Sequence, residues 1–335
     1  MESQSKLFYP KISIITPSFN QGQYLEQTIL SVVEQDYPNL EYIIIDGGST
    51  DNSVEIIKKY ANKITFWVSE PDKGQSDAIN KGMKVATGDI INWLNSDDYY
   101  ESDSLFKVAE AFDKPGTQIV AGRSKIFSGQ NEVLYTSQGT DIYKNNLAKT
   151  IGWARIDQPE TFFRKEVIEK IGPLDNRLHY IMDRDWWIKY LFNYGLDKVS
   201  QIPDILVNFR LHQESKTVSQ ASGFWRERDT YYYALAKGAG LKEQANVLKN
   251  NTYVNEDFEL NKSSFLNEKI IPKVLNYYYL LRANEFYIQN NKAKTKIFLQ
   301  NIRIDWLEEA DKQVWRKLYY RNRYVPTSII KLFRK

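Results

Sequence analysis

The chain has 335 residues, a net charge of +3 and 26% charged residues, a length that accommodates a main domain and a smaller second unit. So small a positive charge argues against a nucleic-acid-binding protein, which normally carries a strongly basic face. The chain has no cysteine and only two histidines, His179 and His212, so disulfide frameworks, thiolate zinc sites and multi-histidine metal sites are excluded. Any divalent metal must therefore be held mainly by oxygen ligands.

The N-terminal third has the pattern of a parallel sheet with crossover helices. Four short apolar segments are predicted as buried strands, at residues 11–17, 41–47, 64–70 and 89–95. Segments with helical periodicity separate them, at residues 23–33, 51–61 and 75–86. This alternation is typical of an α/β fold. A polar group follows each strand, and the carboxyl ends of such strands border the ligand cleft, so these groups are expected to line one cleft.

The first three strand ends allow both a structural and a nucleotide-binding interpretation. The loop that begins at Thr16 is either a plain turn in which Asn20 caps the next helix, or a source of backbone amides for a base or phosphate. Asp46 leaves a triple-isoleucine strand next to two glycines and suits hydrogen bonds to a nucleobase or ribose hydroxyl. Lys73 either faces a phosphate or is a solvated lysine in a Pro-Asp-Lys-Gly turn.

The fourth strand ends in Asn-Ser-Asp-Asp, residues 95–98. Because side chains alternate along a strand, Asn95 and Asp97 are predicted to share a face from which Asp98 points away. Two adjacent carboxylates repel each other, and a divalent cation with oxygen ligands makes their charge density favourable. Alternatively, Asp97 or Asp98 caps the helix that starts near Ser102.

Together these stretches resemble glycosyltransferase family two, the inverting enzymes of GT-A fold that use nucleotide sugars as donors. The match covers "ISIITPSFNQGQYLEQTILSVVEQDYPNLEYIIIDGGSTDNS" and "GQSDAINKGMKVATGDIINWLNSDD", and it continues more weakly from "DQPETFF" to "VNFRLHQES". It implies a Rossmann-like, mostly parallel sheet flanked by helices. It also implies that the donor is bound by Thr16, Pro17, Ser18, Asn20, Asp46, Lys73, Gln75, Asp77, Asn95 and Ser96.

The family's Asp-x-Asp metal motif falls on residues 95–97, where Asn95 replaces the first Asp. The resemblance therefore implies that Asp97 holds Mn²⁺ or Mg²⁺, with His212 as a metal or diphosphate contact. Asn95 is expected to contact the nucleotide, and the missing charge is expected to lower the metal affinity. A cation held by Asp97 would neutralise the diphosphate as it leaves. A lone histidine is otherwise more often structural.

Asp183 stands where the family has the acidic residue that acts as general base, and Met182 replaces the glutamate that is usual before it. A carboxylate within hydrogen-bond reach of an acceptor hydroxyl takes its proton during attack. Asp183 is also a candidate N-cap of the following helix, and Asp185 is the rival base. The positions expected on the acceptor side, or in support of the site, are Asp98, Gln158, Asp185, Trp186 and Arg210.

A domain boundary is predicted near residue 220. Residues 1–220 are expected to form the glycosyltransferase domain, with a nucleotide-sugar half at about 10–100 and an acceptor half at about 101–220. Residues 221–335 are expected to form a C-terminal helical region, in which 274–291 and 293–310 are two helices joined at Asn290 and Asn291. The stretch 312–335 has eight Lys or Arg residues and no acid, which suits either an anionic membrane surface or a solvated basic face.

The resemblance implies a hexosyl-type glycosyltransferase of bacterial surface-polysaccharide synthesis. It is expected to move a sugar, by family default from a UDP-linked donor, to a glycan or lipid-linked glycan acceptor with inversion. The chain has no Q-x-x-R-W motif and no apolar run near the ~20 residues that cross a bilayer, which favours single additions over processive synthesis. No secretory leader is recognisable, so a cytoplasmic location is expected, peripheral to the inner face of the plasma membrane.

Two other classes stay open. A protein of this fold that binds nucleotide sugars or glycans but has lost turnover is suggested by Asn95 and Met182. A nucleotidyltransferase of related sheet topology has less support, because the Gly-rich N-terminal loop of sugar-nucleotide synthesis is absent. Missing G-x-G-x-x-G, P-loop and G-x-S-x-G motifs argue against dinucleotide enzymes, P-loop NTPases and the usual hydrolases.

Overall fold

The computed structural model describes residues 9–129, 132–260 and 268–325. The chain divides into two compact units, each described here by itself. The first contains the described residues up to Asp141, together with Arg155–Tyr190 and Tyr194–Ala221. The second contains Ile142–Ala154, Leu191–Asn193 and the described residues from Ser222 onward. Two short segments of the first 220 residues thus belong to the helical unit.

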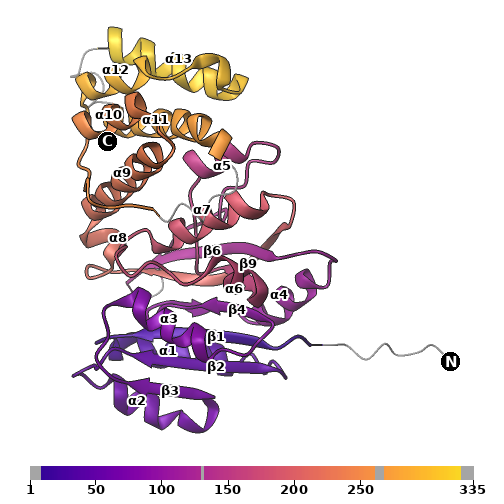
Figure 1. The fold of residues 1–335 in the computed structure, drawn as a ribbon. Helices are drawn as coiled ribbons and strands as arrows, with labels where there is room; N and C mark the ends of the chain where they lie inside the picture. The colour runs from indigo at the N-terminus through magenta and orange to yellow at the C-terminus, as the bar shows by residue number, and fades with distance from the viewer. Residues whose placement is uncertain (1–8, 130–131, 261–267, 326–335) are drawn as a thin grey trace, which may run out of the picture. The chain divides into compact units, whose positions relative to one another are not determined.

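The first unit is built on one sheet, drawn in Figure 1 with β1 to β4 side by side. Within the described residues it has nine strands, in the order β3-β2-β1-β4-β8-β6-β9-β5, with β7 paired to β6. Strands β1 to β4 are parallel, β8 runs antiparallel to both β4 and β6, and β6 and β9 are parallel. The strands are β1 Ile12–Ser18, β2 Leu40–Asp46, β3 Phe66–Ser69, β4 Ile90–Trp93, β5 Tyr99–Tyr100, β6 Ile119–Ser128, β7 Glu132–Thr136, β8 Thr161–Arg164 and β9 Val199–Leu211.

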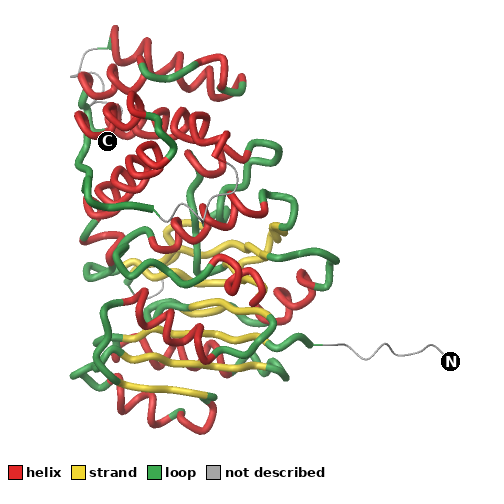
Figure 2. Tube along the Cα trace, viewed as in Figure 1, coloured by secondary structure: helices red, strands yellow, loops and turns green. Residues whose placement is uncertain are grey.

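Helices lie between successive strands from β1 to β4, and Figure 2 draws the helices in red and the strands in yellow. The three helices predicted among the first four strands are confirmed, although the second is shorter than expected and is followed by a 3₁₀ turn, η1. The helices of this unit are α1 Gly22–Val33, α2 Ser53–Lys59, η1 Ala61–Lys63, α3 Gln75–Val85, α4 Ser104–Phe112, α6 Lys165–Ile171, α7 Met182–Tyr194 and α8 Lys216–Ser219. The predicted α/β class with a mostly parallel sheet is therefore confirmed.

Alternation along β1 divides its side chains between two cores. Ile12 and Ile14 are fully buried in a cluster with Leu25 of α1 and other apolar side chains. Ile15 points the other way, toward α3, where a Cβ on Gly82 would lie 2.4 Å from its Cγ2 atom. Because only glycine permits this approach, α3 packs directly on the sheet. Burial on both faces explains why β1 and β2 are nearly continuous apolar runs.

The strand register brings the predicted loops to one edge of the sheet. Ser18 pairs with Asp46, and Asp46 pairs with Ser69, so β1, β2 and β3 end side by side. On the other flank of β1, Ile15 pairs with Trp93 at the end of β4. This is the carboxyl edge, where ligands bind in open α/β sheets.

The second unit is helical in its described residues. Its elements are α5 Leu147–Gly152, α9 Ala221–Gly238, α10 Lys242–Asn251, η3 Glu268–Ile270, α11 Ile271–Ile288, α12 Lys292–Gln300, η4 Ile304–Trp306 and α13 Glu309–Tyr324. Helices α11 and α12 are joined at Asn290 and Asn291, where the sequence places the turn. The expected helix over 293–310 ends at Gln300, because the Asn276 side chain exchanges two hydrogen bonds with the backbone of Arg303 and holds it extended.

Aromatic and ionic contacts hold the second unit together. The rings of Tyr232 and Tyr278 stack with centroids 3.7 Å apart. Asp229 accepts a hydrogen bond from the Tyr278 hydroxyl (2.7 Å) and lies 3.0 Å from Arg282 Nε. Burial raises the pKa of Asp229 to about 6. Among the described residues, none of the helices has both the length and the apolar character that a bilayer span requires.

Candidate active site

The segment after β4 is a turn and not a strand. β4 ends at Trp93, and the Asp98 amide donates to the Asn95 carbonyl at 3.1 Å, which closes a turn over residues 95–98. The predicted strand alternation at Asn95 and Asp97 is therefore wrong, because the strand ends before them. The capping alternative is also wrong, since α4 begins at Ser104 and its N-cap residue is Asp103.

Asp98 is the buried support of this turn, with 1% of its surface exposed. Its Oδ1 atom accepts the Arg210 amide at 2.9 Å, and the Asn95 amide group lies 3.4 Å from its Oδ2 atom. Thr28 of α1 donates to the carbonyls of Ser96 and Asp98. Burial raises the pKa of Asp98 well above its usual range, and the neighbouring Asp97 carboxylate raises it further. Asp98 therefore fixes the turn from inside.

Asp97 is less buried than Asp98, and its carboxylate meets His212. Asp97 Oδ2 lies 3.0 Å from His212 Nε2, with 21% and 12% of the two side chains exposed. Within the described ranges no group of three or more His, Cys, Asp or Glu residues is arranged to hold a metal. A carboxylate and an imidazole nitrogen are nevertheless ligand types of divalent metals. The pair fits a cation whose remaining ligands come from substrate oxygens and water.

Arg210 anchors the segment that carries His212. Its Nε donates to the Asp97 carbonyl at 3.0 Å, and its Nη2 donates to Gln27 Oε1 at 2.5 Å. The guanidinium carbon lies 4.6 Å from the centre of the Tyr24 ring and 4.5 Å from that of Phe127. With its donors and its face so engaged, Arg210 fixes the geometry of the Asp97–His212 pair.

Asp46 is buried at the end of β2 and bound on both oxygens. Oδ1 accepts the Ser49 hydroxyl at 2.5 Å, while Oδ2 accepts the amides of Gly48 and Ser49 and the Ser69 hydroxyl. Gly48 has φ +83°, which a side chain would strain. Asp46 therefore holds the loop after β2 in place and joins it to the end of β3.

Asn20 links the first two loops instead of capping α1. The Asn20 side-chain Oδ1 accepts a hydrogen bond from the Thr50 backbone amide at 2.8 Å, and the Asn20 backbone amide donates to Ser49 Oγ. The first amide of α1, from Gly22, is bound by Asp51 Oδ2 at 2.9 Å. The expectation that Asn20 caps the helix is therefore wrong. These hydrogen bonds join the loops that follow β1 and β2 and fix their backbone at the carboxyl edge of the sheet.

Of the remaining residues predicted to bind the nucleotide-sugar donor, some are buried and some are exposed. Thr16 is buried with its hydroxyl 3.1 Å from the Tyr42 hydroxyl, and Pro17 pairs within the sheet. The Ser18 hydroxyl is buried without a hydrogen-bond partner among the described residues. The Lys73 side chain is exposed, and its amide donates to Asp77 Oδ2 at the start of α3.

The residues predicted for the acceptor side fall into two groups. Asp183 is half-buried in the first turn of α7, where its Oδ1 accepts the Arg184 amide at 2.7 Å. Asp185 is buried and lies 2.7 Å from Lys189 Nζ. Trp186 packs on Phe163 in the core. Asp183 is therefore the more accessible of the two candidate bases, and it follows the first residue of the helix.

Gln158 also belongs to the interior. It is 4% exposed, and its side-chain amide donates to Asn92 Oδ1 (2.8 Å) and the Trp93 carbonyl (2.9 Å). These two hydrogen bonds fix the last residues of β4, which precede the turn. Gln158 thus supports the turn that carries Asp97.

Three residues near this turn escape sequence reasoning. Tyr24 and Gln27 lie one turn apart on α1 and contact Arg210, and the Tyr24 ring is also 4.9 Å from the His212 ring. Lys216 of α8 donates to Gln75 Oε1 at 2.9 Å. Spacing on α1 places Tyr24 and Gln27 on one face, but nothing in the sequence shows that β9 ends beside that face.

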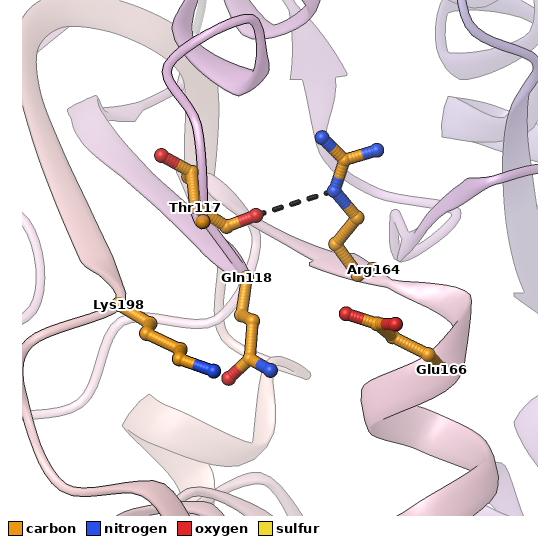
Figure 3. Close-up of a pocket in the computed structure, with 6 residues that line it drawn as sticks. Thr117, Gln118, Arg164, Glu166 and Lys198 are labelled. Carbon is orange, nitrogen blue, oxygen red and sulfur yellow. Dashed lines mark hydrogen bonds between the residues drawn. The ribbon is translucent and has the colours of Figure 1, made fainter.

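A separate hollow lies at the opposite edge of the sheet (Figure 3). It is next to the starts of β6 and β9, and Arg164 Nε donates there to the Thr117 carbonyl at 3.2 Å. The hollow is lined by Gly116, Thr117, Gln118, Arg164, Glu166 and Lys198. It contains none of the residues predicted for the site.

Known proteins resemble this chain in sequence and in fold. Residues 13–172 match the family Glycosyl transferase family 2. An uncharacterized glycosyltransferase of Nostoc sp. is 27% identical over 73% of this chain and 75% of the relative. The putative teichuronic acid biosynthesis glycosyltransferase TuaG of Bacillus subtilis is 34% identical over 40% of this chain and 52% of the relative.

The crystal structure of S. aureus TarS 1–349 in complex with UDP-GlcNAc has a TM-score of 0.55 to this chain at 16% identity. The alignment covers 93% of this chain and 91% of that one. At this identity the likeness concerns the fold, a mostly parallel sheet flanked by helices and followed by further helices.

Proposed function

Because the chain belongs to glycosyl transferase family 2 over residues 13–172 and shares the GT-A fold of TarS, we propose that it transfers a hexosyl group from a nucleotide-diphosphate sugar to an acceptor hydroxyl. The observation that carries this proposal is the Asp97–His212 pair, 3.0 Å apart, beside the loops at the carboxyl edge of the sheet. The UDP-GlcNAc bound to TarS supports a UDP-linked donor. The same proposal includes the individual residues that the sequence predicts to bind the donor, of which Thr16 is the first in the chain and Ser96 the last.

Asp97 and His212 would hold Mn²⁺ or Mg²⁺ together with oxygens of the donor. When bound, such a cation supplies positive charge for the leaving diphosphate. Hydrogen bonds from Arg210 and Thr28, and the buried Asp98 carboxyl, hold the backbone of the turn that carries Asp97. Asn95 accepts a hydrogen bond from Gln75 at 2.7 Å, which suits a linking role better than that of a charged metal ligand.

Asp183 is the proposed general base. Its carboxylate takes the proton of the acceptor hydroxyl, and the hydroxyl oxygen forms a bond to the anomeric carbon. The bond from that carbon to the diphosphate breaks on the opposite side, and the nucleoside diphosphate leaves with the electron pair. A single displacement of this kind inverts the anomeric configuration. The half-buried position of Asp183, in contrast to the buried Asp185, supports this assignment.

The acceptor is proposed to be a glycan or lipid-linked glycan of bacterial surface-polysaccharide synthesis. The names of TuaG and TarS support this class. A membrane-bound acceptor accords with the part of α13 from Gln313 to its end, which carries exposed cations and no acid, whereas the first turn carries the exposed Glu309. From Gln313 onward the exposed residues recur at helical spacing, at Gln313, Arg316, Lys317, Tyr320, Arg321 and Tyr324. We call these six residues, with the exposed Arg323, the basic face of α13.

We infer that the basic face binds an anionic bilayer at the inner face of the plasma membrane. Each basic residue near such a surface contributes about 1 kcal/mol. Tyr320 and Tyr324 are 58% and 65% exposed, and tyrosine is suited to the bilayer interface. Residues 326–335, which complete the predicted basic tail, lie outside the described residues.

Neutralising the basic face is expected to release the protein from anionic vesicles. In the test variant, Gln replaces Arg316, Lys317, Arg321 and Arg323. Its affinity for phosphatidylglycerol vesicles, measured by co-sedimentation, should fall more than about 100-fold, because four positive charges are lost. The matched control replaces four exposed lysines of the first unit by Gln, at Lys58, Lys63, Lys84 and Lys114. Equal loss in both variants would show that only net charge matters, and unchanged binding after removal of 312–335 would show that the tail is not the anchor.

A panel of UDP-, dTDP- and GDP-sugars, read by thermal shift and by nucleotide release with and without Mn²⁺, tests the proposed function. At least one donor is expected to raise the melting temperature and to release its nucleoside diphosphate. The second candidate is a nucleotide-sugar-binding protein without turnover, which Asn95 and Met182 favour. A thermal shift without release, in the presence of diverse glycan acceptors, would support that candidate.

A further inference from the structure

Glu160 is a buried acid that the proposed mechanism does not use. Its side chain has no exposed surface, and neither of its carboxyl oxygens has a hydrogen-bond partner among the described residues. It directly precedes Thr161, the first residue of β8. A negative charge in such a place is strongly unfavourable, because nothing replaces the water that the carboxylate loses on burial.

Two glycine backbones lie next to this side chain. The Gly122 amide donates to the Glu160 carbonyl at 3.0 Å. A Cβ built on Gly139 would lie 3.7 Å from Glu160 Oε1 and only 2.1 Å from the Gly122 carbonyl oxygen. The two backbones thus approach each other too closely for a side chain at residue 139. Neither glycine brings a side chain that could bind the carboxyl.

Three charged groups act on Glu160, and two of them disfavour a negative charge there. Asp157 and Asp98 are the acids, and Arg155 is the cation. Arg155 is bound elsewhere, since its Nη2 donates to the Gly139 carbonyl at 2.6 Å and its Nε lies 3.1 Å from Asp157 Oδ2. Burial, and after it the charge of Asp157, therefore raises the pKa of Glu160 well above its usual range.

The segment that carries Glu160 also holds the end of β4. The Asn92 side chain donates to the Pro159 carbonyl at 2.8 Å and accepts a hydrogen bond from Gln158 Nε2, also at 2.8 Å. The Thr161 amide donates to the Gln158 carbonyl at 2.8 Å. A charge on Glu160 would therefore lie within the segment that fixes β4 just before the turn of residues 95–98.

We propose that Glu160 makes this part of the first unit sensitive to pH. Its carboxyl is uncharged in the folded chain, and its ionisation as the pH rises loosens residues 157–160 and, with them, the end of β4. The folded chain keeps a proton on Glu160 that the unfolded chain releases, so folding becomes less favourable with rising pH. This effect begins above the ordinary pKa of glutamate, about 4.3, and stops growing at the raised pKa of the folded state.

Urea unfolding of the full chain, from about pH 5 to about pH 9, tests the uncharged state. Glu160→Gln keeps the shape of the side chain but cannot ionise. Relative to this variant, the unfolding equilibrium constant of the parent is expected to rise about tenfold per pH unit until the folded-state pKa is reached. Glu160→Met is expected to behave as Glu160→Gln does, and it takes the place of that variant if Glu160→Gln does not fold.

The matched control is Glu166→Gln, which removes the charge of an exposed glutamate on α6. Its unfolding is expected to change with pH as that of the parent does. Parallel pH curves for the parent and Glu160→Gln would show that Glu160 is ionised in the folded chain as in the unfolded one, and would overturn the proposal.

The NMR signal of the Gln158 side-chain amide tests the loosening of the segment. It is expected to shift or broaden in the parent as the pH rises, and to stay unchanged in Glu160→Gln. The Gln35 side-chain amide, which donates to the carbonyls of Ser31 and Glu101, is the internal control and should not respond. A constant Gln158 signal in the parent would show that the segment stays in place, and would overturn the proposal as well.

Discussion

Replacing Asp183 by Asn is expected to lower kcat about 10²–10⁴-fold while donor affinity stays close to that of the parent. Asparagine has nearly the same shape as aspartate, but it cannot take a proton from the acceptor hydroxyl. Asp183 lies in the first turn of α7 and is half-buried, so the substitution leaves the helix and its packing in place. Initial rates at saturating donor and acceptor, with donor affinity from titration, give the two quantities separately.

The control for this substitution is Asp185→Asn. Asp185 is buried and pairs with Lys189 at 2.7 Å, so the substitution removes this ion pair from the interior and is expected to lower the melting temperature. The reverse pattern, in which Asp185→Asn loses kcat and Asp183→Asn retains it, would make Asp185 the base. Equal rates for Asp183→Asn and the parent would remove Asp183 from the mechanism.

Replacing Asp97 by Ala is expected to reduce turnover at least about 100-fold. Loss of a residue that merely orients a metal ligand typically costs about 10–100-fold, and Asp97 is itself the proposed ligand. The variant should also lose most of its affinity for Mn²⁺ in the presence of the nucleoside diphosphate, measured by titration independently of turnover. The melting temperature is expected to change little, since 21% of the Asp97 side chain is exposed and the turn is held through Asp98.

Asp113→Ala is the matched control, because Asp113 is an exposed aspartate at the end of α4, away from the turn. It should behave as the parent in both measurements. Unaltered Mn²⁺ affinity in Asp97→Ala would show that the cation is held elsewhere, and unaltered turnover would exclude Asp97 from the reaction.

The regular part of the fold follows from local patterns in the sequence. Strands buried on both faces are continuous apolar runs, and the helices between them have a clear period, so β1 to β4 and α1 to α3 are predictable. Because parallel strands end at one edge, the meeting of the loops around Thr16 and Asp46 is predictable as well. The end of β4 is not, since it depends on a turn closed by a single backbone hydrogen bond at Asp98.

Contacts between distant segments limit what the sequence reveals about the site. Asp98 meets the Arg210 amide across 112 residues, and Asp97 meets His212 across 115. Family resemblance pointed to His212, whereas no spacing rule indicates Arg210 as the anchor of the turn. The same holds in the helical unit, where Asn276 ends a predicted helix through Arg303. Contacts between residues that are far apart in the sequence leave no periodic pattern in it.

Release of nucleoside diphosphate from a sugar donor is the most direct measurement of the proposed transfer. With Mn²⁺ and a glycan acceptor, the parent is expected to release nucleoside diphosphate from at least one UDP-, dTDP- or GDP-sugar and to form one glycoside of inverted anomeric configuration, seen by NMR. The Asp97→Ala, Asp183→Asn double variant should fall to the background rate. Release by the double variant at the rate of the parent, or a product of retained configuration, would contradict the proposed mechanism.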